Sequence, residues 1–113
     1  MIYHITTKTE WGLAKTAGIY EPESLQTEGF IHCVGADRFA QVANFYFKGR
    51  TSLVVLEINE EQISPSELRW EEVGSYTFPH IYGPLIASAV ERVADLLPDA
   101  NGTFHFPFQQ VLH

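Results

Sequence analysis

The stretch Phe78-Pro79-His80-Ile81-Tyr82-Gly83-Pro84-Leu85 places two prolines, a glycine, a histidine and several bulky apolar side chains within eight positions. A helix is not predicted here, because each proline restricts the residue before it to an extended conformation. We therefore expect a rigid, extended loop. Side chains alternate along an extended chain, so His80 and Tyr82 should point to one side while their apolar neighbours anchor the segment in a core. The alternative is a structural corner that contains a hydrogen-bonded histidine.

The length and composition predict one folded domain. The chain has 113 residues, of which 45% are hydrophobic and 13% aromatic. This supply of apolar side chains is enough for a substantial core. No internal repeat, linker or low-complexity segment divides the sequence, so we expect residues 1–113 to form a single domain.

The charge balance is acidic, with seven basic residues against fourteen acidic ones and a net charge of −7. No basic run provides the positive surface that binds a phosphate backbone, so we do not expect a nucleic-acid partner. The single cysteine, Cys33, cannot form an internal disulfide. The start of the sequence lacks signal-peptide features, and no apolar run approaches the roughly 18 residues of a membrane span. These features predict a cytoplasmic protein with no membrane partner.

Helical and alternating apolar patterns predict an α+β fold. A capping box at Thr7 and Glu10 begins a first helix, at about residues 8–17. Asp37 is the expected N-cap of a second helix, at about residues 37–47. The expected strands are Ile2–Thr6, Phe30–Val34, Ser52–Ile58 and Leu68–Glu72, and the third has the continuous apolar run of a central strand.

The last part of the chain allows two interpretations. Residues 86–97 fit either a helix or an edge strand, and periodicity alone cannot decide between them. The sequence Asp99-Ala100-Asn101-Gly102 is a turn signal, and Thr103–Phe108 carries alternating phenylalanines. A terminal β-hairpin is therefore the preferred prediction. Along the whole chain, buried side chains are expected at Trp11, Phe39, Val42, Leu53, Val55, Phe104 and Phe106.

Three histidines lie in apolar, extended surroundings: His4 and His32 in predicted strands, and His80 in the stretch 78–85. Any one of them taken alone is most simply a core histidine that hydrogen-bonds to the backbone. Two on neighbouring strands and a third on a rigid segment instead indicate a shared pocket. Three histidines also suggest zinc, but these lack the short ligand spacing of common zinc sites, so we expect no metal.

Two further residue pairs are candidates for chemistry. Glu71, next to Trp70, shares a strand face with Arg69, so it either forms a surface ion pair or enters the pocket as a carboxylate. Cys33 is not expected to act as a nucleophile with His32 as its base, because neighbouring residues of a strand point to opposite faces.

Several motifs are spread along almost the whole chain: Ile2-Tyr3-His4-Ile5, Glu28-Gly29-Phe30-Ile31-His32-Cys33, Trp70-Glu71, Phe78-Pro79-His80-Ile81-Tyr82-Gly83-Pro84-Leu85 and Gly102-Thr103-Phe104. Together they resemble the DUF952 family of small bacterial proteins, whose function is unassigned. The resemblance implies an ADP-ribosyltransferase-like fold, which is a split pair of β-sheets, here with two main helices, around a cleft for a nicotinamide dinucleotide.

The resemblance also implies roles for individual residues. In that superfamily the first strand carries an aromatic residue followed by a histidine that holds NAD, and Tyr3-His4 is similar to this motif. The tRNA 2′-phosphotransferases of the same superfamily carry an isoleucine–histidine pair on a later strand, and Ile31-His32 resembles it. NAD, used as a substrate, is therefore the implied cofactor.

These arguments give one main hypothesis and one alternative. In the main hypothesis, the chain binds NAD or an ADP-ribosyl small molecule and cleaves or transfers its ribosyl group. The alternative is a non-catalytic module that binds a small metabolite or a partner, so enzyme activity is left open, as is the oligomeric state. The predicted catalytic residues are His4, His32 and Glu71, and the predicted ligand-binding residues are Tyr3, Trp70, His80 and Tyr82.

Overall fold

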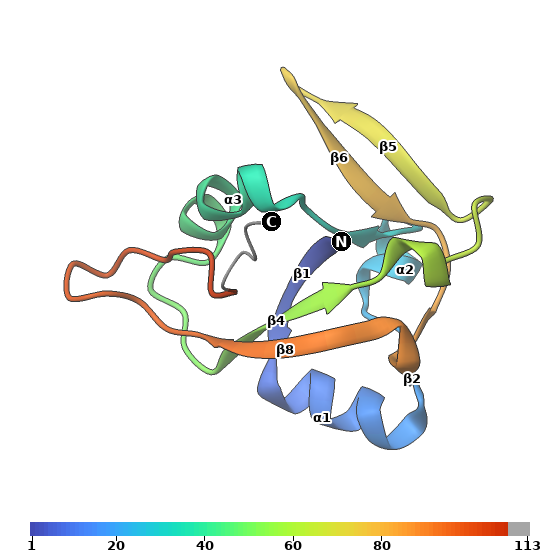
Figure 1. Cartoon of the computed structure of the whole chain (residues 1–113), viewed down its shortest axis with the longest axis horizontal. Helices are drawn as coiled ribbons and strands as arrows, with labels where there is room; N and C mark the ends of the chain where they lie inside the picture. The colour runs from blue at the N-terminus through green and yellow to red at the C-terminus, as the bar shows by residue number, and fades with distance from the viewer. Residues whose placement is uncertain (109–113) are drawn as a thin grey trace, which may run out of the picture.

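The computed structural model describes residues 1–108, and it has an α+β architecture (Figure 1). The described strands form three antiparallel sheets, with the orders β1-β4-β8, β2-β7 and β3-β6-β5. Their bounds are β1 Ile2–Thr7, β2 Ile19–Tyr20, β3 Ile31–His32, β4 Leu53–Ile58, β5 Leu68–Val73, β6 Tyr76–Ile81, β7 Leu85–Ile86 and β8 Val90–Leu96. The two longest described helices are α1 (Lys8–Ala17) and α3 (Phe39–Tyr46), and α2 (Ser24–Thr27) is a single turn. The sequence predicted a split pair of sheets, whereas the described strands form three.

Strand β4 is the centre of the largest sheet, as its apolar run predicted, and all six of its side chains are buried. Alternate residues of β4 serve two separate cores. Val54, Leu56 and Ile58 pack with Trp11 and Ala14 of α1 on one face. On the opposite face, Leu53 and Val55 pack with Phe39 and Ala43 of α3. The two main helices therefore cover opposite faces of this sheet, as Figure 1 shows.

Helix α1 begins and ends where the sequence predicted. The side chain of Thr7 accepts a hydrogen bond from the Glu10 backbone N–H at 3.1 Å, and Gly18 ends the helix in the left-handed conformation with φ +82°. The second half of the predicted capping box is wrong. The Glu10 carboxylate turns away from the Thr7 backbone and accepts a hydrogen bond from the Thr6 hydroxyl at 2.8 Å.

Helix α3 covers most of the predicted range 37–47, but it starts differently. A 3₁₀ turn, Ala36–Arg38, leads into it, and Asp37 makes no side-chain capping bond. Phe39 and Ala43 are fully buried, whereas Tyr46, the last residue of the helix, is 65% exposed. The buried face of α3 therefore does not include Tyr46.

The stretch 78–85 was predicted as a rigid, extended loop, and the structure shows that much of it is paired strand instead. Its first half belongs to β6, which pairs with β3 on one side and with β5 on the other, where the two strands form a hairpin (Figure 1). Pro79 is fully buried within β6, and its carbonyl accepts a hydrogen bond from the Cys33 N–H at 3.1 Å. A proline lacks only the donor, so its carbonyl can still join two segments. The expected extended conformation is correct.

Most of residues 86–97 adopt the strand alternative, because β8 (Val90–Leu96) pairs antiparallel with β4 as an edge strand, after a 3₁₀ turn at Ala87–Ala89. The Asp99–Gly102 turn forms, with the Gly102 N–H donating to the Asp99 carbonyl at 2.9 Å. The prediction of a terminal β-hairpin is wrong, because residues 103–108 form no strand. The side chain of Asn44 on α3 instead donates to the Phe104 carbonyl at 2.9 Å and accepts from the Phe104 N–H at 2.8 Å. These two bonds satisfy the backbone groups that a strand partner would have used.

The predicted core is largely confirmed. Five of its members are at least 92% buried, namely Trp11, Phe39, Leu53, Val55 and Phe104, while Val42 and Phe106 are partly buried. Among the helices of the described chain, none is long and apolar enough to cross a membrane. The cytoplasmic location and the finer likeness to the ADP-ribosyltransferase fold stay predictions.

Candidate functional site

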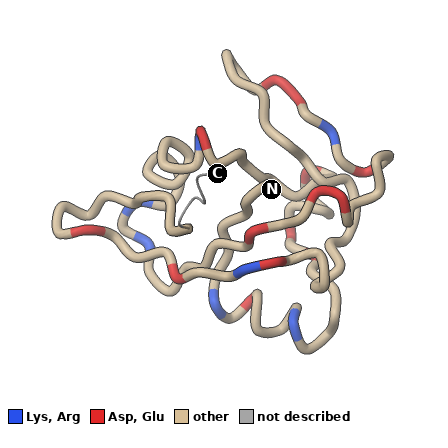
Figure 2. The backbone as a smooth tube through the Cα atoms, in the orientation of Figure 1, with Lys and Arg blue, Asp and Glu red and all other residues tan. Residues whose placement is uncertain are grey.

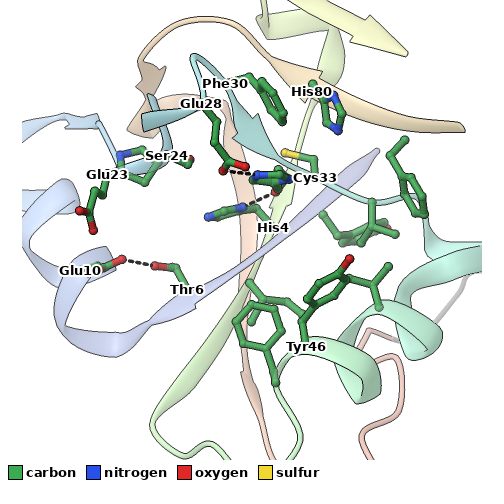
Figure 3. A pocket seen from close by; sticks show the side chains of 18 of the residues that line it. His4, Thr6, Glu10, Glu23, Ser24, Glu28, Phe30, Cys33, Tyr46 and His80 are labelled. Carbon is green, nitrogen blue, oxygen red and sulfur yellow. Dashed lines mark hydrogen bonds and ion pairs between the residues drawn. The ribbon is translucent and has the colours of Figure 1, made fainter. Parts of the chain in front are cut away.

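One pocket of about 740 Å³ brings the three predicted histidines together. His4 comes from β1, His32 from β3 and His80 from β6, and all three side chains line the pocket. Figure 3 shows Phe30 and His80 on one side of the pocket, His4 near its middle, and Glu10 and Thr6 at one end. Three segments that are distant in the sequence therefore contribute to one concave site.

His4 is the most enclosed of the three, with 9% of its surface exposed and protein partners at both ring nitrogens. Its Nδ1 lies 2.5 Å from the His32 carbonyl oxygen, and its Nε2 lies 2.7 Å from the Tyr20 hydroxyl. A carbonyl only accepts, so Nδ1 is the donor of the first bond. Burial lowers the His4 pKa to about 4, so the ring is neutral at pH 7 and Nε2 accepts from Tyr20. Neither ring nitrogen is free for a ligand.

The Tyr20 hydroxyl continues into a chain of polar contacts. It lies 3.0 Å from Thr6 Oγ1, which in turn lies 2.8 Å from Glu10 Oε2. Burial raises the pKa of Tyr20 above its usual value, so this hydroxyl keeps its proton. Thr6, Glu10 and Tyr20 all line the pocket. Sequence analysis assigned Glu10 to a helix cap and missed its place here; the adjacent polar Thr6 in a buried strand was the available signal.

His32 is paired with a carboxylate that the sequence analysis also missed. Its Nε2–H donates to Glu28 Oε2 at 2.7 Å, and both side chains are about half exposed inside the pocket. Gly29, at φ +90°, lies between them and turns the chain so that residues four apart can meet. Within residues 1–108, Nδ1 of His32 has no hydrogen-bond partner, so it can accept a proton from a bound molecule. The Glu28-Gly29-Phe30-Ile31-His32 spacing was the signal in the sequence.

His80 is 5% exposed and is held from the side away from the pocket. Its Nδ1–H donates to Glu71 Oε1 at 2.8 Å, and the Tyr82 hydroxyl donates to the same oxygen. The hydrogen bonds from Tyr82 and then from His80 lower the pKa of Glu71. Phe30 stacks on the His80 ring with a centroid separation of 4.1 Å. The expectation that His80 and Tyr82 point to one side of the chain is confirmed.

The structure does not bring Glu71, Trp70 or Tyr82 into the pocket lining. Glu71 acts as the support of His80, because β5 pairs beside β6 and presents its carboxylate to that ring. Trp70, the next residue on β5, is 51% exposed. The Tyr82 ring lies under the Arg69 guanidinium at 4.6 Å. Their expected roles as catalytic or ligand-contacting residues have no support in this arrangement.

Tyr3 does line the pocket, but its hydroxyl points to a different partner. It donates to the buried Glu57 carboxylate at 3.0 Å, which also accepts two bonds from Arg92 at 2.7 Å. Burial and the adjacent Glu57 raise the pKa of Tyr3 to about 12. Tyr3 therefore offers a ligand its ring and not a free hydroxyl.

The remaining wall is mostly apolar on one side and acidic on the other. The apolar and aromatic side chains are Phe30, Val42, Tyr46, Phe47, Val73 and Phe78. Glu10, Glu23 and Glu28 supply carboxylates, and among the described lining residues Arg50 alone carries a fixed positive charge. Figure 2 shows that acidic positions are also spread over the rest of the molecule, with the basic ones isolated between them.

The hairpin closes one edge of the pocket through its tip. Val73 lines the pocket, and nearby Tyr76 lies 3.8 Å under the guanidinium of Arg38, which precedes α3. A cation over an aromatic face is attractive, so this contact ties the hairpin to the α3 side of the molecule. Among residues 1–108, no group of three or more His, Cys, Asp or Glu side chains is arranged to hold a metal ion. The expectation of no metal stays a prediction.

Comparisons with known proteins identify relatives of the chain. An X-ray structure of protein CC0527 from Caulobacter crescentus is 37% identical, with a TM-score of 0.83 and 92% of each chain covered. The solution NMR structure of CC0527 is 36% identical, with a TM-score of 0.79, and the match covers 90% of this chain and 89% of that one. No curated protein matches. The model of the family described as "Protein of unknown function (DUF952)" matches residues 5–93, so the chain belongs to the DUF952 family.

Proposed function

We propose that the pocket of His4, His32 and His80 binds a small molecule, and that this molecule is NAD or an ADP-ribosyl compound. The observation that carries the proposal is that three histidines from separate segments line one pocket. Its volume of about 740 Å³ lies in the range of small-molecule sites. The resemblance of the sequence to ADP-ribosyltransferase-like proteins supports the choice of ligand.

The aromatic and charged lining residues suit different parts of such a ligand. Phe30 and the neighbouring aromatic side chains offer faces for a flat ring. Arg50 offers the guanidinium that a pyrophosphate group prefers. The carboxylates of Glu10 and Glu28 suit a cationic part, such as the pyridinium ring of NAD.

Cleavage of the bond between a ribose and its leaving base creates positive charge on the ribose. A carboxylate close to that charge stabilises the transition state. Glu28 takes the place that sequence analysis gave to Glu71, because Glu28 lines the pocket and Glu71 does not. The free Nδ1 of His32, whose ring Glu28 orients at 2.7 Å, is placed to accept a proton from the attacking water or hydroxyl.

A specific observation favours a second candidate, a module that binds without turnover. Both ring nitrogens of His4 and one nitrogen each of His32 and His80 already have protein partners. This leaves few ring nitrogens for acid–base chemistry. In this case the ligand would bind and would be recovered unchanged.

Calorimetric titration with NAD and with ADP-ribose tests the proposal. The wild-type chain should bind at least one of them below millimolar concentration, and His32→Ala should weaken binding by roughly 0.5–1.5 kcal/mol, the net contribution of a typical hydrogen bond. His105→Ala is the matched control, because His105 makes the same kind of pair with Asp99 at 2.7 Å but does not line the pocket. No binding of either compound at millimolar concentration would refute the proposed ligand. Chromatographic detection of released nicotinamide separates the enzyme from the binding module.

A further inference from the structure

The polar contacts that begin at His4 form one unbroken line to the pocket. His4 Nε2 contacts Tyr20 Oη at 2.7 Å, Tyr20 Oη contacts Thr6 Oγ1 at 3.0 Å, and Thr6 Oγ1 contacts Glu10 Oε2 at 2.8 Å. His4 is 9%, Thr6 5% and Tyr20 3% exposed, whereas Glu10 is exposed. The line therefore runs from an enclosed imidazole to a carboxylate at the pocket surface.

The three contacts from His4 Nε2 to Glu10 can hold three protons, one more than they contain when His4 is neutral and Glu10 is a carboxylate. His4 Nδ1 keeps its proton in every state, because it faces the His32 carbonyl. Each of the three remaining contacts needs one proton, but the hydroxyls of Tyr20 and Thr6 bring only two. With a neutral His4 and a carboxylate at Glu10, one contact has no proton. A third proton would satisfy all three contacts at once.

We propose that His4, Tyr20, Thr6 and Glu10 form a proton relay, in which Glu10 exchanges a proton with the contents of the pocket and His4 is the enclosed terminus. A proton arriving at Glu10 lets its O–H donate to Thr6, while Thr6 donates its own proton to Tyr20 and Tyr20 donates to His4 Nε2. If each proton moves one contact along, Glu10 becomes a carboxylate and His4 an imidazolium. The number of protons is unchanged in that step.

The relay gives Glu10 a role that His4 itself cannot fill. Both His4 ring nitrogens are occupied by protein groups, so His4 cannot take a proton directly from a bound molecule. Glu10 lines the pocket and can. His4, Tyr20 and Thr6 are then positioning residues that give the accepted proton additional places to reside. The inference does not depend on which ligand the pocket binds.

A test of the relay must separate its effect on the protonation of His4 from the effects of the other charged and titratable groups around the ring. Burial is the main effect that disfavours a second proton on His4, and the charge of the His32 ring on β3 acts in the same direction. The hydrogen bond to the His32 carbonyl and the charge of Glu10 on α1 favour that proton. Tyr20 of β2 contacts the ring, and Cys33, just after β3, lies near Tyr20. Glu10 could act on His4 through the relay or through space, so the experiment has to distinguish these routes.

A double-mutant cycle on Glu10 and Thr6, read by ¹⁵N NMR of the His4 ring, makes that distinction. The fraction of doubly protonated His4 is measured at pH 5, above the His4 pKa of about 4. Thr6→Val, which keeps the shape and removes the hydroxyl, should lower this fraction about tenfold, the size of a coupling of about one pH unit. Thr6→Ser, the matched control that keeps the hydroxyl, should leave it unchanged.

The Glu10→Gln substitution should also lower the fraction, although Glu10 does not touch His4. In the double variant, the fraction of doubly protonated His4 should be no lower than in Thr6→Val alone, because Thr6→Val already interrupts the relay between Glu10 and His4. Additive effects, or a wild-type fraction in Thr6→Val, would overturn the relay. If Thr6→Val does not fold, Tyr20→Phe removes the next hydroxyl of the relay and completes the cycle with Glu10→Gln. The same two outcomes then support or overturn the relay.

Discussion

The side chain of Asn44 makes the hydrogen bonds that join the chain after β8 to α3, beside the packing of Phe104 and Phe106 on Phe39. Its amide donates to the Phe104 carbonyl at 2.9 Å and accepts from the Phe104 N–H at 2.8 Å, and Phe104 is only 1% exposed. Asn44→Ala leaves both backbone groups buried without a partner. Each such group costs about 1–3 kcal/mol, so we expect a loss of about 2–6 kcal/mol in the free energy of unfolding.

Urea unfolding, followed by tryptophan fluorescence, measures this loss. Asn44→Asp should lose roughly half as much, because a carboxylate accepts from the Phe104 N–H but cannot donate to its carbonyl. Asn59→Ala is the control: the Asn59 side chain bonds to the exposed Glu91 and to one turn N–H, so its loss should stay near 1 kcal/mol. If Asn44→Ala loses no more than Asn59→Ala, the docking role of Asn44 is refuted.

Three further predictions concern buried groups. Because the pKa of His4 is about 4 in the folded chain, against 6.5 for an ordinary histidine, the unfolded state binds more protons between these values. Stability should therefore rise by about 3 kcal/mol from pH 4 to pH 6.5, and urea midpoints that stay flat over this range would contradict it. Burial raises the pKa of the Cys33 thiol, so a thiol reagent at pH 8 should label native protein far more slowly than protein in urea; equal labelling rates would show that the thiol is accessible. Arg92→Met should lower stability by about 1–3 kcal/mol, because it strands the buried Glu57 carboxylate; an unchanged melting temperature would count against this.

The sequence predicted best where local pattern and tertiary packing agree. The continuous apolar run of β4 and the bounds of α1 are both set by neighbouring residues, and both predictions are confirmed, although the Glu10 half of the capping box was wrong. Residues 103–108 were predicted as a strand because their phenylalanines alternate. Instead, the backbone N–H and carbonyl of Phe104 are both paired by Asn44, 60 residues away. Periodicity contains no information about such a distant side chain.

Part of the candidate site could also be predicted from local sequence patterns. Burial of histidines in apolar segments indicated His4, His32 and His80, and all three line one pocket. Glu28 and Glu10 were missed because their places depend on the turn at Gly29 and on the choice of Thr6 as partner. Glu71 was expected inside the pocket, but the pairing of β5 with β6 directs its carboxylate to the outer side of His80.

The backbone of β3 connects His32 to the segments that carry His4 and His80. Its His32 carbonyl holds His4 Nδ1 at 2.5 Å, and His32 lies directly opposite His80 in the pairing of β3 with β6. Strand β3 is only two residues long, but Cys33 and Val34 directly after it make backbone hydrogen bonds to Pro79 of β6 and to Tyr3 of β1. These bonds connect His32 to the strands that carry His80 and His4. A molecule that touches only His32 would shift the surroundings of His4 and His80 as well. Chemical-shift changes at all three rings on ligand addition would therefore report movement of β3, and would not by themselves show that all three rings touch the ligand.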